Sequence, residues 1–189
     1  MKAILEWAAK KRLTLMRILV PLILVALVVF DHKPLPLLRD WFNAAHLGMF
    51  VVLAGLLLRS WAAGMIHKNT ILTTTGPYAL SRHPLYLGSL LLALGFALIV
   101  NSWPLWIVLG AMLLLAYVPK IRQEEVKLQR LFGDDWLAYK RDVAVFFPKK
   151  LRWGKLWKKW SLTVWWRHRE FNAWLASLAG LALLAWWGK

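Results

Sequence analysis

Apolar residues in this chain gather into long runs that short polar segments interrupt. Five runs follow one another from the N-terminus: Leu13–Phe30, Trp41–Leu58, Leu85–Val100, Trp103–Val118 and Trp174–Trp187. A helix needs about 20 apolar residues to cross the hydrocarbon core of a bilayer, so these runs reach that length with their interfacial flanks. The pattern predicts an all-α, polytopic membrane protein with about five transmembrane helices.

The composition supports this prediction, because 60% of the 189 residues are hydrophobic and only 18% are charged. A soluble domain of this length buries its core without such a bias. The first run has the basic start of a signal peptide, but it contains Pro21 and leads into Asp31–Pro34 without a small-residue cleavage site. We therefore expect a retained first span.

Two segments predict how the helices are connected. Asn101 and Ser102 alone separate the third run from the fourth, which predicts a tight helical hairpin. Lys120–Phe132 then mixes apolar and charged residues in the manner of an amphipathic helix that continues the fourth span. Gly133–Asp135 is expected to end or bend this helix.

The last third of the chain is basic and rich in tryptophan between Lys149 and Arg169. Four apolar residues there recur every three to four positions, which predicts a single helical face: Trp153, Leu156, Trp157 and Trp160. A helix of this kind lies in the membrane interface.

The formal charge of +16 gives the predicted orientation. With the N-terminus inside and five spans, all 25 Lys and Arg residues except Lys33, Arg39 and Lys189 fall on the cytoplasmic side. This is the positive-inside pattern. The charges flank spans, which favours contact with anionic lipid headgroups over nucleic acid. Because the chain has no cysteine, disulfides, thiolate metal sites and a cysteine nucleophile are excluded, and we expect no metal site.

A candidate binding motif precedes the third run, where Gly76–Gly88 reads as a turn followed by a helix start. Pro84 suits the first turn of a helix, and the free amides at such a helix end favour a carboxylate. Arg82 adds a permanent cation, and Tyr86 shares a helix face with His83. Each residue alone could be an anchor or a belt residue, but the set predicts a ligand site.

A second motif follows the fourth run, where Glu124 and Glu125 come shortly after Arg122. The chain has only nine acidic residues, so an adjacent pair among basic residues is unusual. These carboxylates could bind a cationic ligand or its hydroxyl groups. The alternative is an ion pair with Arg122, Lys120 or Lys127.

The two motifs together resemble the isoprenylcysteine carboxyl methyltransferase family, whose superfamily includes phospholipid N-methyltransferases. The resemblance covers about Gly55–Pro148 and rests on these elements: Arg59-x-x-Ala62, Gly76-Pro77-Tyr78, Arg82-His83-Pro84-x-Tyr86-x-Gly88, Glu124-Glu125, and Phe132-Gly133-x-x-Trp136-x-x-Tyr139 ahead of Pro148.

The resemblance implies that S-adenosylmethionine is the cofactor and lies between the cytoplasmic end of the hairpin and the helix that follows it. The cofactor-binding residues that it implies are Tyr78, Arg82, His83, Pro84, Tyr86, Leu87, Gly88, Glu124, Glu125 and Tyr139. Its site would hold the adenine against an aromatic ring, for which Tyr78, Tyr86 and Trp136 are candidates. Which glutamate meets which cofactor group stays open.

The methyl acceptor decides which residues catalyse the reaction. Positioning and desolvation supply most of the acceleration in a methyl transfer. A carboxylate acceptor needs no base, and Arg59 or Arg122 could orient it; an amine or thiol needs a base such as Glu124, Glu125 or His83. The catalytic candidates are therefore Arg59, Arg122 and Glu124.

The acceptor itself is expected to be a lipid or an amphipathic small molecule. Four residues of the segment before the first motif could line its path, or simply pack at the interface: Met65, Ile66, Ile71 and Leu72. Membrane lipids are the other expected partners.

These expectations describe one integral membrane domain over residues 1–189. Residues 13–58 hold the first two spans, residues 59–148 the cofactor-binding catalytic core, and residues 149–189 the interfacial helix and the last span. We expect a multi-pass protein of a bacterial or archaeal inner membrane, with the N-terminus and the active site in the cytoplasm.

Two other function classes stay open. A membrane NADPH-dependent reductase of the steroid-reductase type would have a similar nucleotide site, although the Glu124–Glu125 pair argues against an additional phosphate there. A non-catalytic membrane scaffold would use the basic tail and would tolerate the loss of His83 or Glu124.

Overall fold

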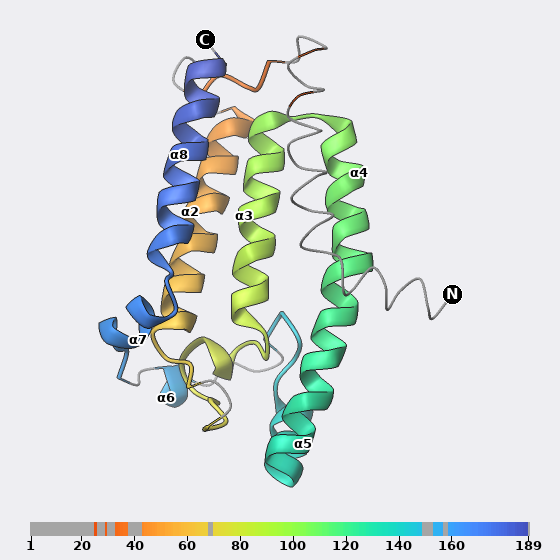
Figure 1. The fold of residues 1–189 in the computed structure, drawn as a ribbon, viewed down its shortest axis with the longest axis vertical. Helices are drawn as coiled ribbons and strands as arrows, with labels where there is room; N and C mark the ends of the chain where they lie inside the picture. The colour runs from red at the N-terminus through yellow and green to blue at the C-terminus, as the bar shows by residue number, and fades with distance from the viewer. Residues whose placement is uncertain are drawn as a thin grey trace.

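The protein is all-helical wherever the computed structural model describes it, namely in residues 25, 29, 33–37, 43–67, 70–148, 153–156 and 159–188. The elements in chain order are α2 (Ala44–Ala63), η1 (Gly76–Ala79), α3 (Pro84–Val100), α4 (Trp103–Met112), η2 (Leu113–Tyr117), α5 (Val118–Asp142), α6 (Trp153–Leu156), α7 (Leu162–Arg167) and α8 (Phe171–Trp187). Figure 1 shows α8, α2, α3 and α4 side by side, with α5 projecting beyond them. The predicted all-α class is confirmed.

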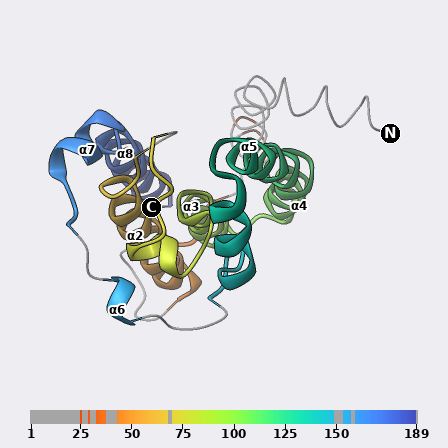
Figure 2. The same ribbon diagram turned by 90° about the horizontal axis from the view of Figure 1, so that it is seen from below.

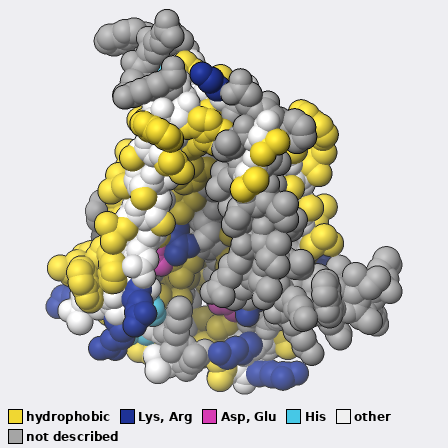
Figure 3. All heavy atoms as spheres, turned by 45° about the horizontal axis from the view of Figure 1, so that its top comes forward, with side chains coloured by type: hydrophobic (Ala, Val, Ile, Leu, Met, Phe, Trp, Pro, Cys, Tyr) yellow, Lys and Arg dark blue, Asp and Glu magenta, His cyan; other side chains and the backbone are white. Residues whose placement is uncertain are grey.

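The surface of the helices fits a membrane environment. Among the described residues, two helices are long and apolar enough to cross a bilayer, α2 and the continuous helix Trp103–Asp142, while α3 and α8 are shorter apolar helices. Large apolar side chains such as Phe50, Ile107 and Leu175 lie exposed on their outer faces. Figure 3 shows this apolar flank, with the Lys and Arg side chains gathered towards one end. So wide an apolar surface is typical of a protein that associates with a membrane.

The five predicted runs compare with these helices as follows. The second to fifth runs coincide with α2, α3, α4 with η2, and α8. The first predicted span, Leu13–Phe30, lies outside the described residues apart from Val25 and Val29.

The most extensive helix contact joins α2 and α3, which run antiparallel. Gly48 faces Gly95, so that a Cβ placed on Gly48 would lie 2.7 Å from the carbonyl oxygen of Gly95. Two turns further along, a Cβ on Gly55 would lie 2.8 Å from the carbonyl oxygen of Gly88. Small residues allow two backbones to approach this closely, which is a principal way of packing helices in lipid. We call these four residues the glycine seam.

The connection between α3 and α4 is as short as predicted, but the tight hairpin is not confirmed. Asn101 reverses the chain in a left-handed conformation, with a φ of 51°. From there α4 diverges from α3, as Figures 1 and 2 show. The reason is that α3 presents its glycines to α2, whereas a Cβ added to Gly110 of α4 would meet no atom of the described residues within 4 Å.

The amphipathic helix and its bend are confirmed. A single π-helical stretch, η2, connects α4 to α5, and such stretches occur often beside functional sites. Gly133 interrupts α5 with a φ of 50° and a ψ of −123°, values that favour glycine. The helix therefore changes direction where the sequence predicted a bend, and continues to Asp142.

The predicted helical face in the tail is wrong in its extent. Helix α6 ends at Leu156, residues 157–158 lie outside the described part, and Trp160 is not helical. The indole nitrogen of Trp160 donates a hydrogen bond of 2.9 Å to the carbonyl oxygen of Ser60. This carbonyl belongs to the last turn of α2 and also accepts from the backbone amide of Gly64 at 3.1 Å. The tail therefore contacts the end of α2 instead of continuing as a helix.

The glycine seam generates a prediction about stability. The substitution Gly95→Ala should lower the free energy of unfolding by about 1–3 kcal/mol, because the new methyl group would overlap backbone atoms of α2 that cannot move independently. Gly110→Ala is the matched control, since its methyl group would meet no atom of the described residues within 4 Å and alanine favours a helix over glycine by about 1 kcal/mol. Unfolding of both variants in the same detergent measures the difference, and equal stability would contradict the seam.

Candidate functional site

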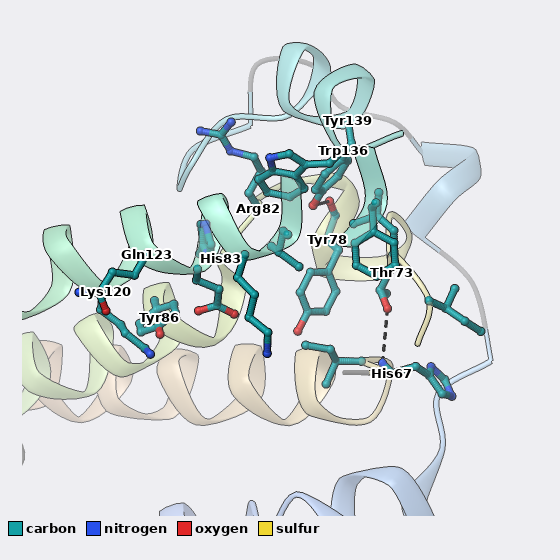
Figure 4. Close-up of a pocket in the computed structure, with 17 residues that line it drawn as sticks. His67, Thr73, Tyr78, Arg82, His83, Tyr86, Lys120, Gln123, Trp136 and Tyr139 are labelled. Carbon is teal, nitrogen blue, oxygen red and sulfur yellow. Dashed lines mark hydrogen bonds between the residues drawn. The ribbon is translucent and has the colours of Figure 1, made fainter. Parts of the chain in front are cut away.

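A cavity of about 520 Å³ lies at the end of the bundle where α3 begins and α5 projects. Its walls come from three parts of the chain: residues 66–67 with 71–73, the segment from η1 into α3, and α5. The volume lies within the usual range for small-molecule and cofactor sites. Figure 4 shows the side chains that line the cavity, among them Tyr78, Lys120 and Trp136.

The turn before α3 forms as the sequence predicts. Gly76 has a φ of 63° and opens the short helix η1. Any other residue would be strained at this φ, and its Cβ would displace the thioether of Met65. Pro84 then starts α3, with His83 directly before it. The turn therefore delivers the first motif to the edge of the cavity.

The chain after α5 folds back along this motif. The backbone amide of Arg82 donates to the carbonyl of Ala144 at 2.9 Å, and that of His83 to the carbonyl of Val145 at 3.3 Å. The hydroxyl of Ser81 donates to the same Val145 oxygen at 2.7 Å. These bonds fix the far end of α5 relative to the start of α3.

Two aromatic residues of α5 complete the contact. The hydroxyl of Tyr139 donates to the carbonyl oxygen of Tyr78 at 2.7 Å, and Trp136 beside it is fully buried. Burial raises the pKa of both Tyr78 and Tyr139 above the ordinary value of 10.0. Both tyrosines therefore stay protonated and remain able to donate.

Glu125 is the centre of a buried charge cluster. Its Oε1 lies 3.1 Å from Nη2 of Arg82 and 3.6 Å from Nε2 of His83, and its Oε2 lies 2.9 Å from Nζ of Lys140. Burial alone would raise the pKa of Glu125, but the hydrogen bond from Lys140 and the charge of Arg82 outweigh it and lower the pKa. The carboxylate therefore stays ionised and joins α5 to the motif.

His83 occupies the boundary between this cluster and the cavity. Burial lowers the pKa of its imidazole, although the nearby carboxylates of Glu124 and Glu125 act in the opposite direction. Its ring contacts the edge of Tyr86 at a centroid distance of 5.7 Å, and Tyr86 contacts Tyr117 of η2 at 5.6 Å. A neutral imidazole and the ring of Tyr86 thus form one wall, and Tyr117, which does not line the cavity, contacts Tyr86.

The structure places the predicted site residues in two groups. Six of them line the cavity: Tyr78, Arg82, His83, Tyr86, Glu124 and Tyr139. Glu125 lies behind Arg82, Pro84 is buried at the helix start, and Gly88 belongs to the glycine seam. Leu87 does not line the cavity.

The two predicted catalytic arginines also lie outside the cavity. Arg122 is exposed on α5. Arg59 forms an ion pair with Glu170 at the start of α8, at 2.7 Å between Nη2 and Oε1. Of the three catalytic candidates, the structure brings only Glu124 to the cavity.

The adjacent glutamates therefore face different surroundings, a distinction that the sequence left open. Successive residues of an α-helix point about 100° apart, so Glu125 meets Arg82 while Glu124 faces the cavity. Lys120, Gln123 and Lys127 share the face of Glu124. Their spacing of three to four residues is the signal that could have identified them.

The lysines were expected only as partners of the glutamates. Among the described residues, the ion pairs are Arg59–Glu170, Arg82–Glu125 and Lys140–Glu125, while the neutral imidazole of His83 lies 3.6 Å from Glu125. Within that part of the chain, Lys120 and Lys127 contribute positive charge to the cavity without a carboxylate in ion-pair distance.

The opposite wall is apolar and comes from the segment after α2. Ile66, Ile71 and Leu72 line the cavity there, whereas Met65 packs beneath the turn at Gly76. The backbone amide of His67 donates to the hydroxyl of Thr73 at 3.5 Å, shown as a dashed line in Figure 4.

Four buried polar atoms of cavity-lining residues point to a ligand. The hydroxyl of Tyr78, the indole nitrogen of Trp136, Nε of Arg82 and Nε2 of His83 have no hydrogen-bond partner among the described residues. Buried polar groups are nearly always paired, so each of these is suited to meet a bound molecule.

Comparison with known proteins gives one family match and two relatives that cover most of the chain. Residues 45–135 match the family model described as phospholipid methyltransferase. The chain is 33% identical to the nickel-cobalt-cadmium resistance protein NccN of Alcaligenes xylosoxydans xylosoxydans, over 76% of this chain and 68% of that protein. It is also 33% identical to the cobalt-zinc-cadmium resistance protein CzcN of Cupriavidus metallidurans, over 78% of this chain and 68% of the relative.

A eukaryotic enzyme is similar over a shorter region. The protein-S-isoprenylcysteine O-methyltransferase of Schizosaccharomyces pombe is 30% identical over 98 residues, which is 52% of this chain and 42% of the enzyme. No solved structure matches the chain significantly.

The buried imidazole generates a prediction about pH. Because the pKa of His83 in the folded protein lies below its usual 6.5, the unfolded chain binds more protons in this range. The free energy of unfolding should therefore fall as the pH drops below about 6.5. Because the pKa of Glu125 lies below its usual 4.5, protonation of this carboxylate lowers the free energy of unfolding only at lower pH. Chemical unfolding between pH ~7.5 and ~5 should show this loss in the native protein and a reduced loss in His83→Gln. An unchanged slope in the variant would assign the effect to other groups.

Proposed function

Because the chain belongs to the superfamily of isoprenylcysteine carboxyl methyltransferases and phospholipid methyltransferases, we propose that it transfers a methyl group from S-adenosylmethionine to a lipid or amphipathic acceptor at the cytoplasmic membrane face. The observation that carries the proposal is the cavity in which Glu124, His83 and Tyr78 converge. Helices of membrane length beside it support a site at the edge of the bilayer.

The cavity residues suit the groups of this cofactor. S-adenosylmethionine offers a carboxylate, an ammonium, ribose hydroxyls and a flat adenine, and its sulfonium supplies an already activated methyl group. Glu124 would accept hydrogen bonds from the ammonium or the ribose. The unpaired hydroxyl of Tyr78 and indole nitrogen of Trp136 would donate to the remaining oxygen and nitrogen atoms.

Arg82 and Glu125 act in this proposal by shaping the site. Glu125 pairs with Arg82 and also with Lys140, so the carboxylate fixes the wall while the three groups together keep a net positive charge. The remaining work of the protein is to orient the reactants and to exclude water, which are the main contributions to a methyl transfer. If the acceptor is an amine or thiol, Glu124 is the cavity-lining base.

The distribution of charge favours an acceptor with an anionic group. Among the described residues that line the cavity, three charged side chains are in no ion pair: the cations Lys120 and Lys127 and the carboxylate Glu124. Positive charge is therefore in excess. The cofactor brings a further net positive charge. An acceptor with a phosphate or carboxylate beside its reactive atom would balance this excess, and the apolar wall at Ile66 and Leu72 would accept its hydrocarbon part.

The location follows from the charges at the ends of the helices. Basic residues predominate beside the cavity, in α5 and in the tail after it, which favours a cytoplasmic location for this end under the positive-inside rule. The proposal retains about five spans and an inner membrane, and the two resistance proteins similar to this chain come from bacteria.

Methyl transfer can be tested directly in membranes that contain the protein. Incubation with S-adenosylmethionine carrying a radioactive methyl group should label the lipid fraction or an amphipathic small molecule. Glu124→Gln should reduce the rate by about 10²-fold or more, because the substitution removes the only carboxylate among the described residues that line the cavity.

Asp135→Asn is the matched control, since Asp135 is an exposed acid of the same helix outside the cavity. Label that depends on the protein but appears in the protein fraction would exclude the proposed acceptor class. Calorimetric titration separates the reductase alternative: binding of NADPH without binding of S-adenosylmethionine would refute methyl transfer.

A further inference from the structure

Arg59 connects three helices near the cavity. Its Nε and Nη2 donate to the two carboxylate oxygens of Glu170 at 3.1 and 2.7 Å. Its Nη1 donates to the hydroxyl of Ser89 and, at 3.4 Å, to the carbonyl oxygen of Leu85. The end of α2, the first turns of α3 and the start of α8 therefore meet at one guanidinium.

The ion pair is shielded from solvent, with 21% of the Arg59 side chain and 7% of the Glu170 side chain exposed. Two charges lose much of their hydration in such a place, and apolar residues of similar volume often stabilise a protein equally well. Stability is thus a poor explanation for the pair. What distinguishes the pair is its defined geometry, because a bidentate guanidinium–carboxylate pair allows the two side chains only a narrow range of relative orientations.

The guanidinium acts on the first turn of α3. The Leu85 carbonyl accepts from Arg59 and also from the Ser89 hydroxyl, at 2.9 Å in the second case. Leu85 lies between His83 and Tyr86, which both line the cavity. The aliphatic part of Arg59 also crosses Gly88, where a Cβ would lie 2.5 Å from Cγ of the arginine. Movement of Arg59 would therefore move the wall of the cavity.

Glu170 lies outside residues 45–135, the part that the family model matches. We propose that Glu170 is a positioning residue, which through Arg59 holds the first turn of α3 so that His83 and Tyr86 face the cavity. Helix α8 then belongs to the binding site, although it does not line the cavity. The inference rests on the proposed function only in the choice of S-adenosylmethionine as the ligand.

The test replaces the pair by apolar residues, in the variant Arg59→Met/Glu170→Leu of the full chain. The midpoint of thermal unfolding should stay within a few degrees of the native value. The affinity for S-adenosylmethionine, measured by calorimetry, should fall about tenfold because the wall is misplaced. Glu170→Asp should recover most of that affinity, and Ser177→Ala, a buried serine of the same helix, should leave it unchanged.

Hydrogen exchange of the ligand-free protein gives a second measurement that does not depend on the cofactor. The hydrogen-bonded amides of Arg82, His83 and Leu87 should exchange faster in the pair variant, while those of α4 should not change. Unchanged exchange and unchanged affinity in a folded variant would overturn the inference. A native protein that fails to bind S-adenosylmethionine would instead refute the proposed function, and the exchange result would still decide the role of Glu170.

If the pair variant does not fold, Glu170→Gln and Ser89→Ala replace it. Each should weaken cofactor binding by about threefold, and the double variant should show less than the product of the two effects, because both act through Arg59. Fully multiplicative effects would show that Glu170 and Ser89 act independently, which would overturn the proposed route.

Discussion

One carboxylate holds the two halves of the site together. Glu125 lies between Arg82 of the segment before α3 and Lys140 near the end of α5, at 3.1 and 2.9 Å. Without it, two cations would face each other, and the Arg82 side chain, which is only 8% exposed, would lose the carboxylate that pairs with it. The backbone bonds from Arg82 and His83 to the chain after α5 join the same two parts of the protein. The cavity is therefore the space that this tie leaves between α5 and the rest of the protein.

The contacts of Glu125 can hold α5 in place only if α3 is itself fixed, and the glycine seam fixes α3 against α2. Close contact between Gly55 and Gly88 sets the height of α3 against α2, and the contacts of Arg59 set the rotation of its first turn. Packing that depends on backbone contact tolerates little sliding, since any shift brings carbonyl oxygens together. The wall formed by the start of α3 is thus rigid because of helix packing, and the wall formed by α5 is held by ion pairs.

The sequence predicted the positions of helices and turns better than it predicted which side chains contact each other. Runs of apolar residues predicted the helices, and the bend at Gly133 and the turn at Gly76 followed from glycine chemistry. The different surroundings of Glu124 and Glu125 could not be predicted, because they depend on how α5 is rotated about its axis. The pairing of Arg59 with Glu170 joins residues 111 positions apart, and no local pattern reports such a contact. The prediction that Trp160 belongs to a helical face was wrong for the same reason, since its indole nitrogen binds a backbone carbonyl of α2 that lies far away in the sequence.

The way in which the site is closed has a consequence for its assembly during synthesis. The α2–α3 pair is complete once residue 100 has been made. The bonds that close the cavity use Ala144 and Val145, and α8 adds its carboxylate from residue 170. Because chains fold from the N-terminus as they emerge, the ribosome delivers a preformed half-site first and the closing elements last. A nascent chain that ends before Ala144 therefore has the first binding motif in place and no enclosed cavity.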